Sequence, residues 1–238
     1  RSTPKPSSAA SDVYKRQAQG LVAVLNQYYE NTQQACISVA DVQEGQVVDT
    51  VPLPWPSIGP LAIGGGRVYV GHEENGEDYL SAVDVATHQV IATVATDFLY
   101  YGHPLIVDAD AGRLYTVFGD HLEARAADDL TLLDTFPFAR VSDEIGLALD
   151  TAGDRLYLAL GEQVLVIQAS TLRQVDTFSH PNNAPLQACF LDAAGERLYV
   201  QGGNAILTLD ANTGQVLARI TPKSIGDYWR LVGCLLYT

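Results

Sequence analysis

Short apolar runs alternate with turn residues along most of this chain. In the segment 144–178 the runs lie at 144–150, 155–160, 164–167 and 175–178, with glycine, aspartate, serine and threonine between them. Runs of four to seven residues bounded by such turn residues are typical of β-strands. The pattern therefore predicts four strands in this segment, which we call a, b, c and d in chain order.

Strand b recurs along the chain. Four copies share an Arg-x-Tyr pattern: Arg67-Val68-Tyr69-Val70, Arg113-Leu114-Tyr115-Thr116, Arg155-Leu156-Tyr157-Leu158 and Arg197-Leu198-Tyr199-Val200. Their tyrosines are 46, 42 and 42 residues apart. A fixed period of this size indicates a repeat architecture. A residue that returns in every repeat serves the repeat itself, so we expect these arginines and tyrosines to join neighbouring repeats.

The turns recur with the strands. A glycine closes the a–b turn at Gly112, Gly153 and Gly195, and positive φ at glycine suits such a hairpin. Each repeat is therefore predicted to be a four-stranded antiparallel meander. Strands b and c are apolar almost throughout, so both faces of each sheet need cover. Face-to-face stacking of such sheets is the propeller arrangement, whose blades have about 40–45 residues.

The predicted fold is an all-β β-propeller fragment of four-stranded antiparallel blades. Four whole blades are expected at about 57–97, 102–138, 143–179 and 183–222. An earlier blade contributes strands b, c and d at 21–24, 35–39 and 47–51 but lacks its strand a, and residues 228–232 begin a further blade. A sandwich or barrel is the rival all-β fold, but neither predicts near-identical strands at constant spacing.

Over about residues 18–233 the repeats resemble the YVTN-type propeller family, the YncE-like proteins. The resemblance rests on Leu198-Tyr199-Val200, on residues 207–214 and on the hairpin 192–199. The family's asparagine after the strand-b tyrosine is absent here. The resemblance implies about seven blades and a periplasmic or secreted location. A WD40 repeat, suggested by Gly71-His72, fits less well because no Trp-Asp pair closes any strand c.

The two ends differ from the repeats. Residues 1–17 and 234–238 resemble translated sequencing-adapter tails, and the chain contains no methionine. A Pro/Ser-rich linker is the alternative for residues 1–17. We therefore expect a non-native or disordered tail at 1–17, propeller repeats at 18–233 and a non-native tail at 234–238.

Charge narrows the classes of partner. The net charge is −14, which argues against nucleic acid and anionic membrane surfaces because both require a basic footprint. The apolar runs are all shorter than the roughly 18–20 residues of a membrane span. The expected partner is a protein or a small-molecule ligand. Cys36 and Cys189 lie in predicted strands, so we interpret them as buried thiols.

Candidate binding residues lie where the b–c and d–a connections meet. We expect these connections, for example 71–78, to be long and varied, which places function on their side of the sheets. Five polar residues at the starts of successive strands a form the candidate ligand site: Ser57, His103, Glu144, Asn183 and Asp227. His103 and Glu144 are the candidate ligands for a divalent metal such as Zn²⁺ or Cu²⁺. The acidic stretch 73–78 could hold Ca²⁺, although a solvated hairpin tip is the simpler interpretation.

Catalytic motifs are missing from the sequence. It contains no Gly-x-Ser-x-Gly, no His-Glu-x-x-His and no phosphate-binding glycine loop followed by lysine. The favoured function is a non-catalytic YVTN/YncE-like propeller that binds a partner or small ligand through its loop-rich face. The alternative, which the resemblance suggests, is a propeller enzyme of the lactonase or quinoprotein dehydrogenase type.

Overall fold

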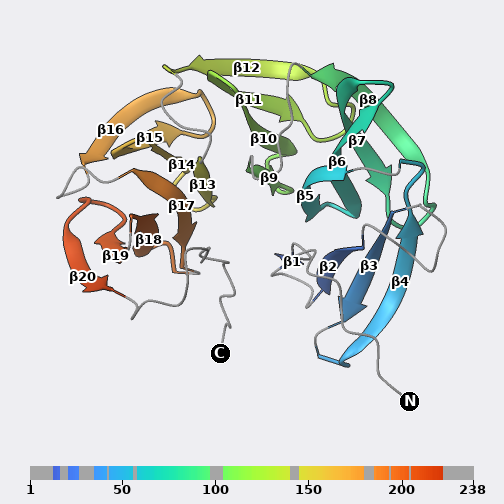
Figure 1. The fold of residues 1–238 in the computed structure, drawn as a ribbon, viewed down its shortest axis with the longest axis horizontal. Coiled ribbons are helices and arrows are strands. Elements are labelled where there is room, and N and C mark those ends of the chain that lie inside the picture. The colour runs from blue at the N-terminus through green and yellow to red at the C-terminus, as the bar shows by residue number, and fades with distance from the viewer. Residues whose placement is uncertain are drawn as a thin grey trace. The chain divides into compact units, whose positions relative to one another are not determined.

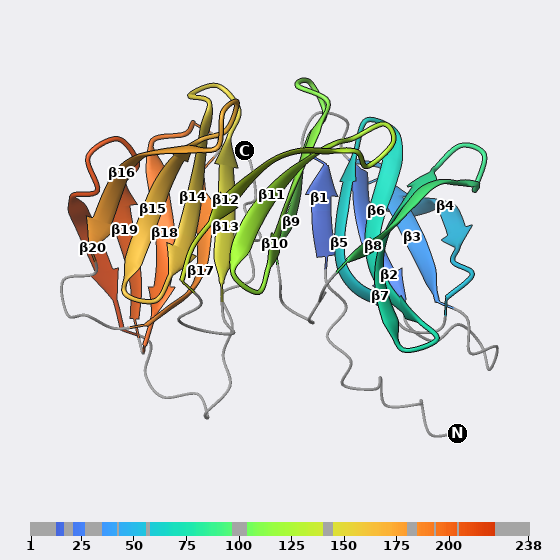
Figure 2. The same cartoon turned by 90° about the horizontal axis from the view of Figure 1, so that it is seen from above.

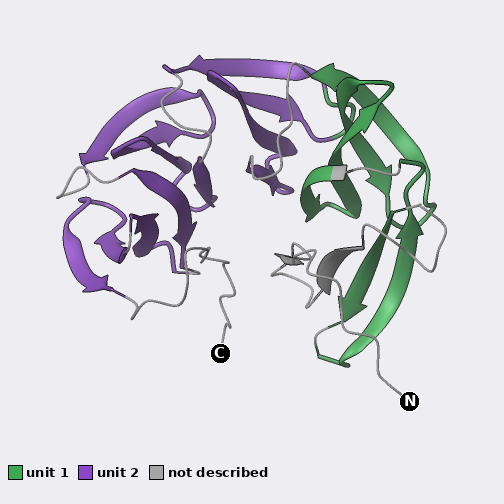
Figure 3. Cartoon of the chain, in the orientation of Figure 1, with its two compact units in different colours: residues 1–99, 128–130 green, residues 100–127, 131–238 purple. Residues whose placement is uncertain are grey.

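The structure is a computed structural model of the 238-residue chain. The described residues are 13–16, 21–26, 35–41, 43–55, 58–96, 104–139, 145–179, 185–192, 194–203 and 205–221. For residues 13–16, 21–26 and 58 only the backbone is described. The chain forms two compact units, Arg1–Leu99 with Asp128–Leu130 and Tyr100–Ala127 with Thr131–Thr238, which Figure 3 colours separately.

The first unit contains two four-stranded antiparallel sheets (Figure 1). The first sheet consists of β1 (Val13–Arg16), β2 (Leu21–Asn26), β3 (Cys36–Asp41) and β4 (Gln46–Pro52). The second consists of β5 (Ile58–Gly64), β6 (Arg67–Glu74), β7 (Glu77–Asp84) and β8 (Val90–Thr96). Each strand pairs with the next one along the chain, as expected for a meander.

The second unit contains three more sheets of the same topology, whose strands lie side by side in Figure 2. The third sheet consists of β9 (Leu105–Asp108), β10 (Arg113–Phe118), β11 (His121–Ala126) and β12 (Leu132–Pro137). The fourth consists of β13 (Gly146–Asp150), β14 (Arg155–Leu160), β15 (Gln163–Gln168) and β16 (Arg173–Ser179). The fifth consists of β17 (Leu186–Leu191), β18 (Arg197–Gly202), β19 (Ala205–Asp210) and β20 (Val216–Ile220).

These sheets confirm the predicted all-β fold of repeated four-stranded antiparallel blades. One detail of the prediction is wrong. The first sheet was expected to lack its strand a, but β1 occupies that place and pairs with β2 from Val13↔Val24 to Arg16↔Leu21. The strand predicted at 228–232 lies outside the described residues.

The connections between strands b and c are shorter than expected. Residues 71–78 were predicted to form a long loop, yet β6 continues to Glu74 and β7 begins at Glu77. Asn75 and Gly76, at φ 56° and 82°, make the two-residue turn between them. Asn-Gly is the pair that such a turn favours, because both positions need positive φ. The acidic stretch is therefore the exposed tip of a hairpin.

Apolar layers lie between neighbouring sheets of each unit. In the first unit, Ile37 and Val39 of β3 pack with Val68 and Val70 of β6. In the second unit, one layer joins the third and fourth sheets and another joins the fourth and fifth. Strands b and c of the fourth sheet are thus covered on both faces, which explains why they are apolar throughout.

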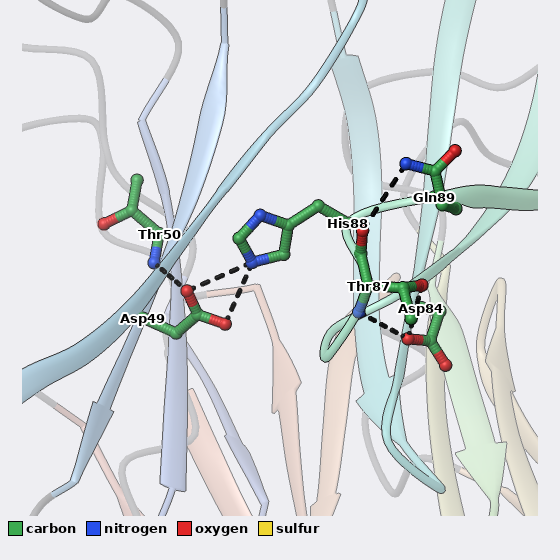
Figure 4. Close-up of polar contacts among 6 residues, drawn as sticks. All are labelled: Asp49, Thr50, Asp84, Thr87, His88 and Gln89. Carbon is green, nitrogen blue, oxygen red and sulfur yellow. Dashed lines mark hydrogen bonds and ion pairs between the residues drawn. The ribbon is translucent and has the colours of Figure 1, made fainter.

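The c–d turn repeats a single backbone conformation. Its fourth residue after the end of strand c has positive φ in every sheet: Gly45, His88, Leu130, Leu172 and Gly214. An aspartate ends strand c in three sheets, and its carboxylate accepts hydrogen bonds from the turn. Asp84, for example, accepts hydrogen bonds from both the backbone N–H and the hydroxyl of Thr87, each at 2.8 Å (Figure 4). The backbone geometry is therefore conserved through the repeats, although the side chain at the positive-φ position varies.

Candidate functional site

Each sheet has two ends with different connections. We call the end that carries the a–b and c–d turns the turn side, and the end that carries the b–c and d–a connections the loop side. The five predicted site residues, Ser57, His103, Glu144, Asn183 and Asp227, all lie outside the described residues. Four of them precede the starts of β5, β9, β13 and β17 by one to three residues. The predicted ligand site and its metal therefore stay predictions.

Strands a of successive sheets lie beside one another within each unit. In the first unit β1 contacts β5, and in the second unit β13 contacts both β9 and β17. This places the starts of neighbouring strands a close together in the fold. These contacts between strands do not test the five predicted side chains, which lie outside the described residues.

A stack of three aromatic rings lies on the loop side of the first unit, among the described residues. Trp55 follows β4, His72 lies near the end of β6, and Tyr79 lies opposite His72 on β7. The Trp55 and His72 ring centroids are 3.6 Å apart with a 17° interplanar angle, and those of His72 and Tyr79 are 5.6 Å apart at 18°. The imidazole is thus held between two larger aromatic rings.

The His72 ring is also held by a chain of hydrogen bonds that begins at its Nε2. Its Nε2 lies 2.9 Å from the Ser81 hydroxyl, which lies 2.8 Å from the hydroxyl of Thr93. Its Nδ1 is buried and has no hydrogen-bond partner among the described residues. His72 is only 3 % exposed, and this burial lowers the pKa of its imidazole to about 4. His72 is therefore neutral near pH 7.

The His72–Ser81 pair has the separation of a base and its nucleophile, but its surroundings differ from those of a catalytic pair. Ser81 is completely buried, so a substrate has no access to its hydroxyl. The hydroxyl also contacts Thr93, an exposed residue of β8. The pair therefore acts as a structural link that ties the segment before β5 to strands c and d of the second sheet.

An acidic rim lies next to this stack. Tyr79 donates its hydroxyl hydrogen to Glu77 at 2.8 Å, and Glu73, Glu74 and Glu77 are exposed. The exposed carboxylates and the half-buried Tyr79 ring together form an acidic surface with an aromatic edge. Such a surface suits a basic or cationic partner.

A network of polar side chains lies on the loop side of the third sheet, in the second unit. His121 begins β11 and places Nδ1 2.9 Å from Asp120 and Nε2 3.3 Å from Glu123. Arg125 donates from Nε to the other oxygen of Glu123 at 2.7 Å. Because Glu123 is buried, these two donors compensate its desolvation. Among the described residues, no three such groups are placed to hold a metal ion.

The turn side uses the recurrent arginines and tyrosines. Tyr115 and Tyr157 donate their hydroxyls to the carbonyls of Ala169 and Ala211 in the next sheet, at 3.1 and 3.0 Å. Arg155 contacts the side chain of Asn212 at 2.8 Å, and Arg67 contacts Asp128 within the first unit. Burial raises the pKa of the Tyr157 hydroxyl, which keeps it a donor. These contacts confirm the prediction that the recurrent residues join neighbouring repeats for Arg67, Tyr115, Arg155 and Tyr157.

The buried thiols are also confirmed. Cys36 and Cys189 are buried and are not joined in a disulfide, and Cys189 donates to the carbonyl of Tyr157 at 3.2 Å. Burial raises the pKa of the Cys189 thiol to about 12, so it is not a nucleophile near pH 7.

The sequence pattern pointed to His72 but not to its partners Trp55, Tyr79 and Ser81. A usable signal was present, because Trp55 is one of only two tryptophans and the corresponding places of the other repeats hold no tryptophan. The cross-strand position of Tyr79, however, follows only once the turn at Asn75-Gly76 sets the register of the hairpin.

Comparison with known proteins gives no relative for this chain: neither a protein-family model nor a curated protein matches it. Within the described ranges, the structure has no helix long and apolar enough to cross a membrane.

Proposed function

We propose that this chain is a non-catalytic binding scaffold of the YVTN/YncE propeller type, which takes a protein partner or a small ligand on its loop side. The proposal includes an extracytoplasmic location. Family and location both rest on the resemblance of the strand-b and hairpin motifs.

One observation carries the proposal: the two sides of the sheets use their side chains differently. On the turn side, residues that recur in each repeat are occupied by contacts between sheets, such as Tyr115 with Ala169 and Tyr157 with Ala211. On the loop side, the His72 stack and the His121 network have different compositions. A rigid scaffold that varies its side chains at one end is suited to recognition at that end.

The acidic hairpin tip offers the sharpest test of partner binding. A Glu74→Lys/Glu77→Lys chain, immobilised and exposed to a cell extract, should retain about tenfold less of any bound protein than the wild type. Asp110→Lys is the matched control, because Asp110 is exposed on a turn between strands a and b. Equal retention by all three chains would contradict binding at this tip.

The predicted metal needs a separate test. Titration of the chain with Zn²⁺, Cu²⁺ and Ca²⁺ by calorimetry should give heat that disappears in His103→Ala, while the melting temperature stays nearly unchanged. His88→Ala is the control, because His88 lies on the turn side. No heat above buffer for the wild type removes the metal and leaves the partner-binding scaffold.

A further inference from the structure

The contacts between consecutive sheets follow one pattern, and the fifth sheet carries the same donor residues without their acceptors. In the fourth sheet, Arg155 and Tyr157 of strand b contact the c–d turn of the fifth sheet. The matching residues of the fifth sheet are Arg197 and Tyr199. Arg197 is exposed, Tyr199 is partly exposed, and neither side chain has a hydrogen-bond partner in the described part of the chain.

The row of side chains around each tyrosine shows the same difference. In the fourth sheet, Ala148, Tyr157 and Val166 lie opposite one another and are at most 5 % exposed, because the fifth sheet covers them. In the fifth sheet the corresponding Phe190 and Tyr199 remain partly exposed, and the third residue of the row, Thr208, is polar and 8 % exposed. This face is therefore built for a neighbouring sheet.

Strand d adds an apolar contact to the pattern, between its side chain and the c–d turn of the next sheet. A Cβ on Gly214, at the positive-φ position of the fifth sheet's c–d turn, would lie 2.3–3.0 Å from the Phe178 side chain of β16. Phe178 thus fills the space above Gly214. The residue that corresponds to Phe178 on β20 is Ile220, which follows it by one 42-residue period and is 57 % exposed.

The first sheet supplies the matching open acceptor. Gly45 has the backbone conformation of Gly214, with φ +68° against +69°, and a Cβ added to Gly45 would meet nothing within 4 Å. Gln43 occupies the place that Asn212 has in the fifth sheet, and its side chain is exposed. The turn from Gln43 to Gly45 therefore offers the space and the side-chain amide that the fourth sheet finds on the fifth.

We propose that the fifth sheet of one copy docks on the c–d turn of the first sheet of a second copy, with Ile220 over Gly45 and Arg197 beside Gln43. The contact is heterologous: one copy contributes its fifth sheet and the other its first. Such contacts join copies head to tail, into a closed ring or an open chain.

Sedimentation velocity of the full chain tests the docking. The wild type should associate with increasing concentration. Ile220→Asp should weaken this association more than tenfold, since a charge would replace an isoleucine that the contact between the two copies buries. Leu217→Asp is the matched control, because Leu217 corresponds to Val175, which stays 58 % exposed although a sheet follows it. A wild type that is monomeric at all concentrations, or equal weakening by both variants, overturns the proposal.

Disulfide trapping tests the orientation, because the Phe178 Cβ lies 3.0 Å from a Cβ placed on Gly214, close to disulfide reach. In a Cys234→Ser background, Ile220→Cys chains mixed with Gly45→Cys chains should form disulfide-linked dimers. Efficient linking of Ile220→Cys chains to each other would show a symmetric contact and overturn the head-to-tail arrangement. A third chain carries both Ile220→Cys and Gly45→Cys. If a disulfide forms within that single chain in dilute solution, the fifth sheet does not need a second copy as its partner, and the proposal is overturned.

Discussion

The same strands form the turn side and the loop side, but the described polar contacts recur from sheet to sheet on the turn side and differ from sheet to sheet on the loop side. On the turn side one set of contacts recurs from sheet to sheet, as when Tyr115 and Tyr157 donate to Ala169 and Ala211. On the loop side His72 is neutral and stacked between rings, whereas His121 is surrounded by Asp120 and Glu123. Recurrence therefore identifies residues that hold the sheets together, and the varied loop side is the surface on which we propose binding.

The largest expected effect separates a covered tyrosine from an uncovered one. Tyr157→Ala should lower the free energy of unfolding by about 4 kcal/mol, because it removes a fully buried ring and the hydrogen bond to Ala211. Tyr199→Ala, at the same place in the fifth sheet, should cost about 1 kcal/mol, since Tyr199 is partly exposed and has no hydrogen-bond partner in the described part of the chain. Urea denaturation of dilute protein measures both values. Equal losses would show that burial between sheets is not what distinguishes them.

The second effect concerns the loop side and depends on pH. His72 has a pKa of about 4 in the folded chain against 6.5 as the ordinary value, so the unfolded chain binds its proton first as the pH falls. Stability should therefore be complete above pH 6.5 and fall by about 3 kcal/mol between pH 6.5 and 4. Urea denaturation at a series of pH values gives this slope.

His72→Phe should flatten this slope, since it retains a ring between Trp55 and Tyr79 but cannot titrate. Acidic residues on the turn side act at lower pH. Hydrogen bonds from Thr87 and Thr213 lower the pKa of Asp84 and Asp210 below 3.8, so their stabilisation is lost only below that value. An unchanged slope between pH 6.5 and 4 in His72→Phe would assign the effect to other groups.

A third comparison uses two glycines with one backbone conformation. Gly214→Ala should cost about 2–3 kcal/mol, because a residue with a Cβ is strained at φ +69° and the new methyl group meets Phe178. Gly45→Ala should cost only about 1 kcal/mol, the strain alone, since its Cβ meets nothing within 4 Å. Thermal melts of both variants in dilute solution provide the difference. A similar loss in both would mean that Phe178 moves aside freely.

The smallest effect is expected at His88, which shares the positive-φ position. Its Nε2 lies 3.1 Å from both carboxylate oxygens of Asp49 on β4 (Figure 4). His88→Gly should change stability by less than about 0.5 kcal/mol, because relief of the φ 58° strain offsets the loss of a part-exposed pair. Leu172→Gly should cost about 2 kcal/mol, since Leu172 is buried at the same position. Differential scanning calorimetry distinguishes the two outcomes.

Much of the fold was predictable because its signals are local. The four blades predicted at about 57–97, 102–138, 143–179 and 183–222 match the sheets at 58–96, 105–137, 146–179 and 186–220. Strand β1 was missed, because residues 13–16 carry two basic side chains and no strand alternation that would distinguish them from a tail. The length of the 71–78 connection was overestimated because its charged residues resemble a loop, although Asn75-Gly76 marks a tight turn.

The candidate site was less predictable. The repeat period places Ser57, His103, Glu144, Asn183 and Asp227 in equivalent positions, but equivalence along the chain does not show which side chains meet. The His72 stack illustrates the difficulty. Its three rings come from a connecting segment and two strands, and the other repeats have no tryptophan at the place of Trp55.

The sequence by itself determined the strand order, the a–b and c–d turns and the role of the Arg-x-Tyr motif, because each depends on short periodicities and on residues that suit particular φ values. The tertiary structure decided which groups meet between sheets: Tyr157 with a carbonyl 54 residues away, His88 with Asp49, and Trp55 with His72. These contacts depend on how whole sheets pack, and packing brings together residues that no local pattern relates.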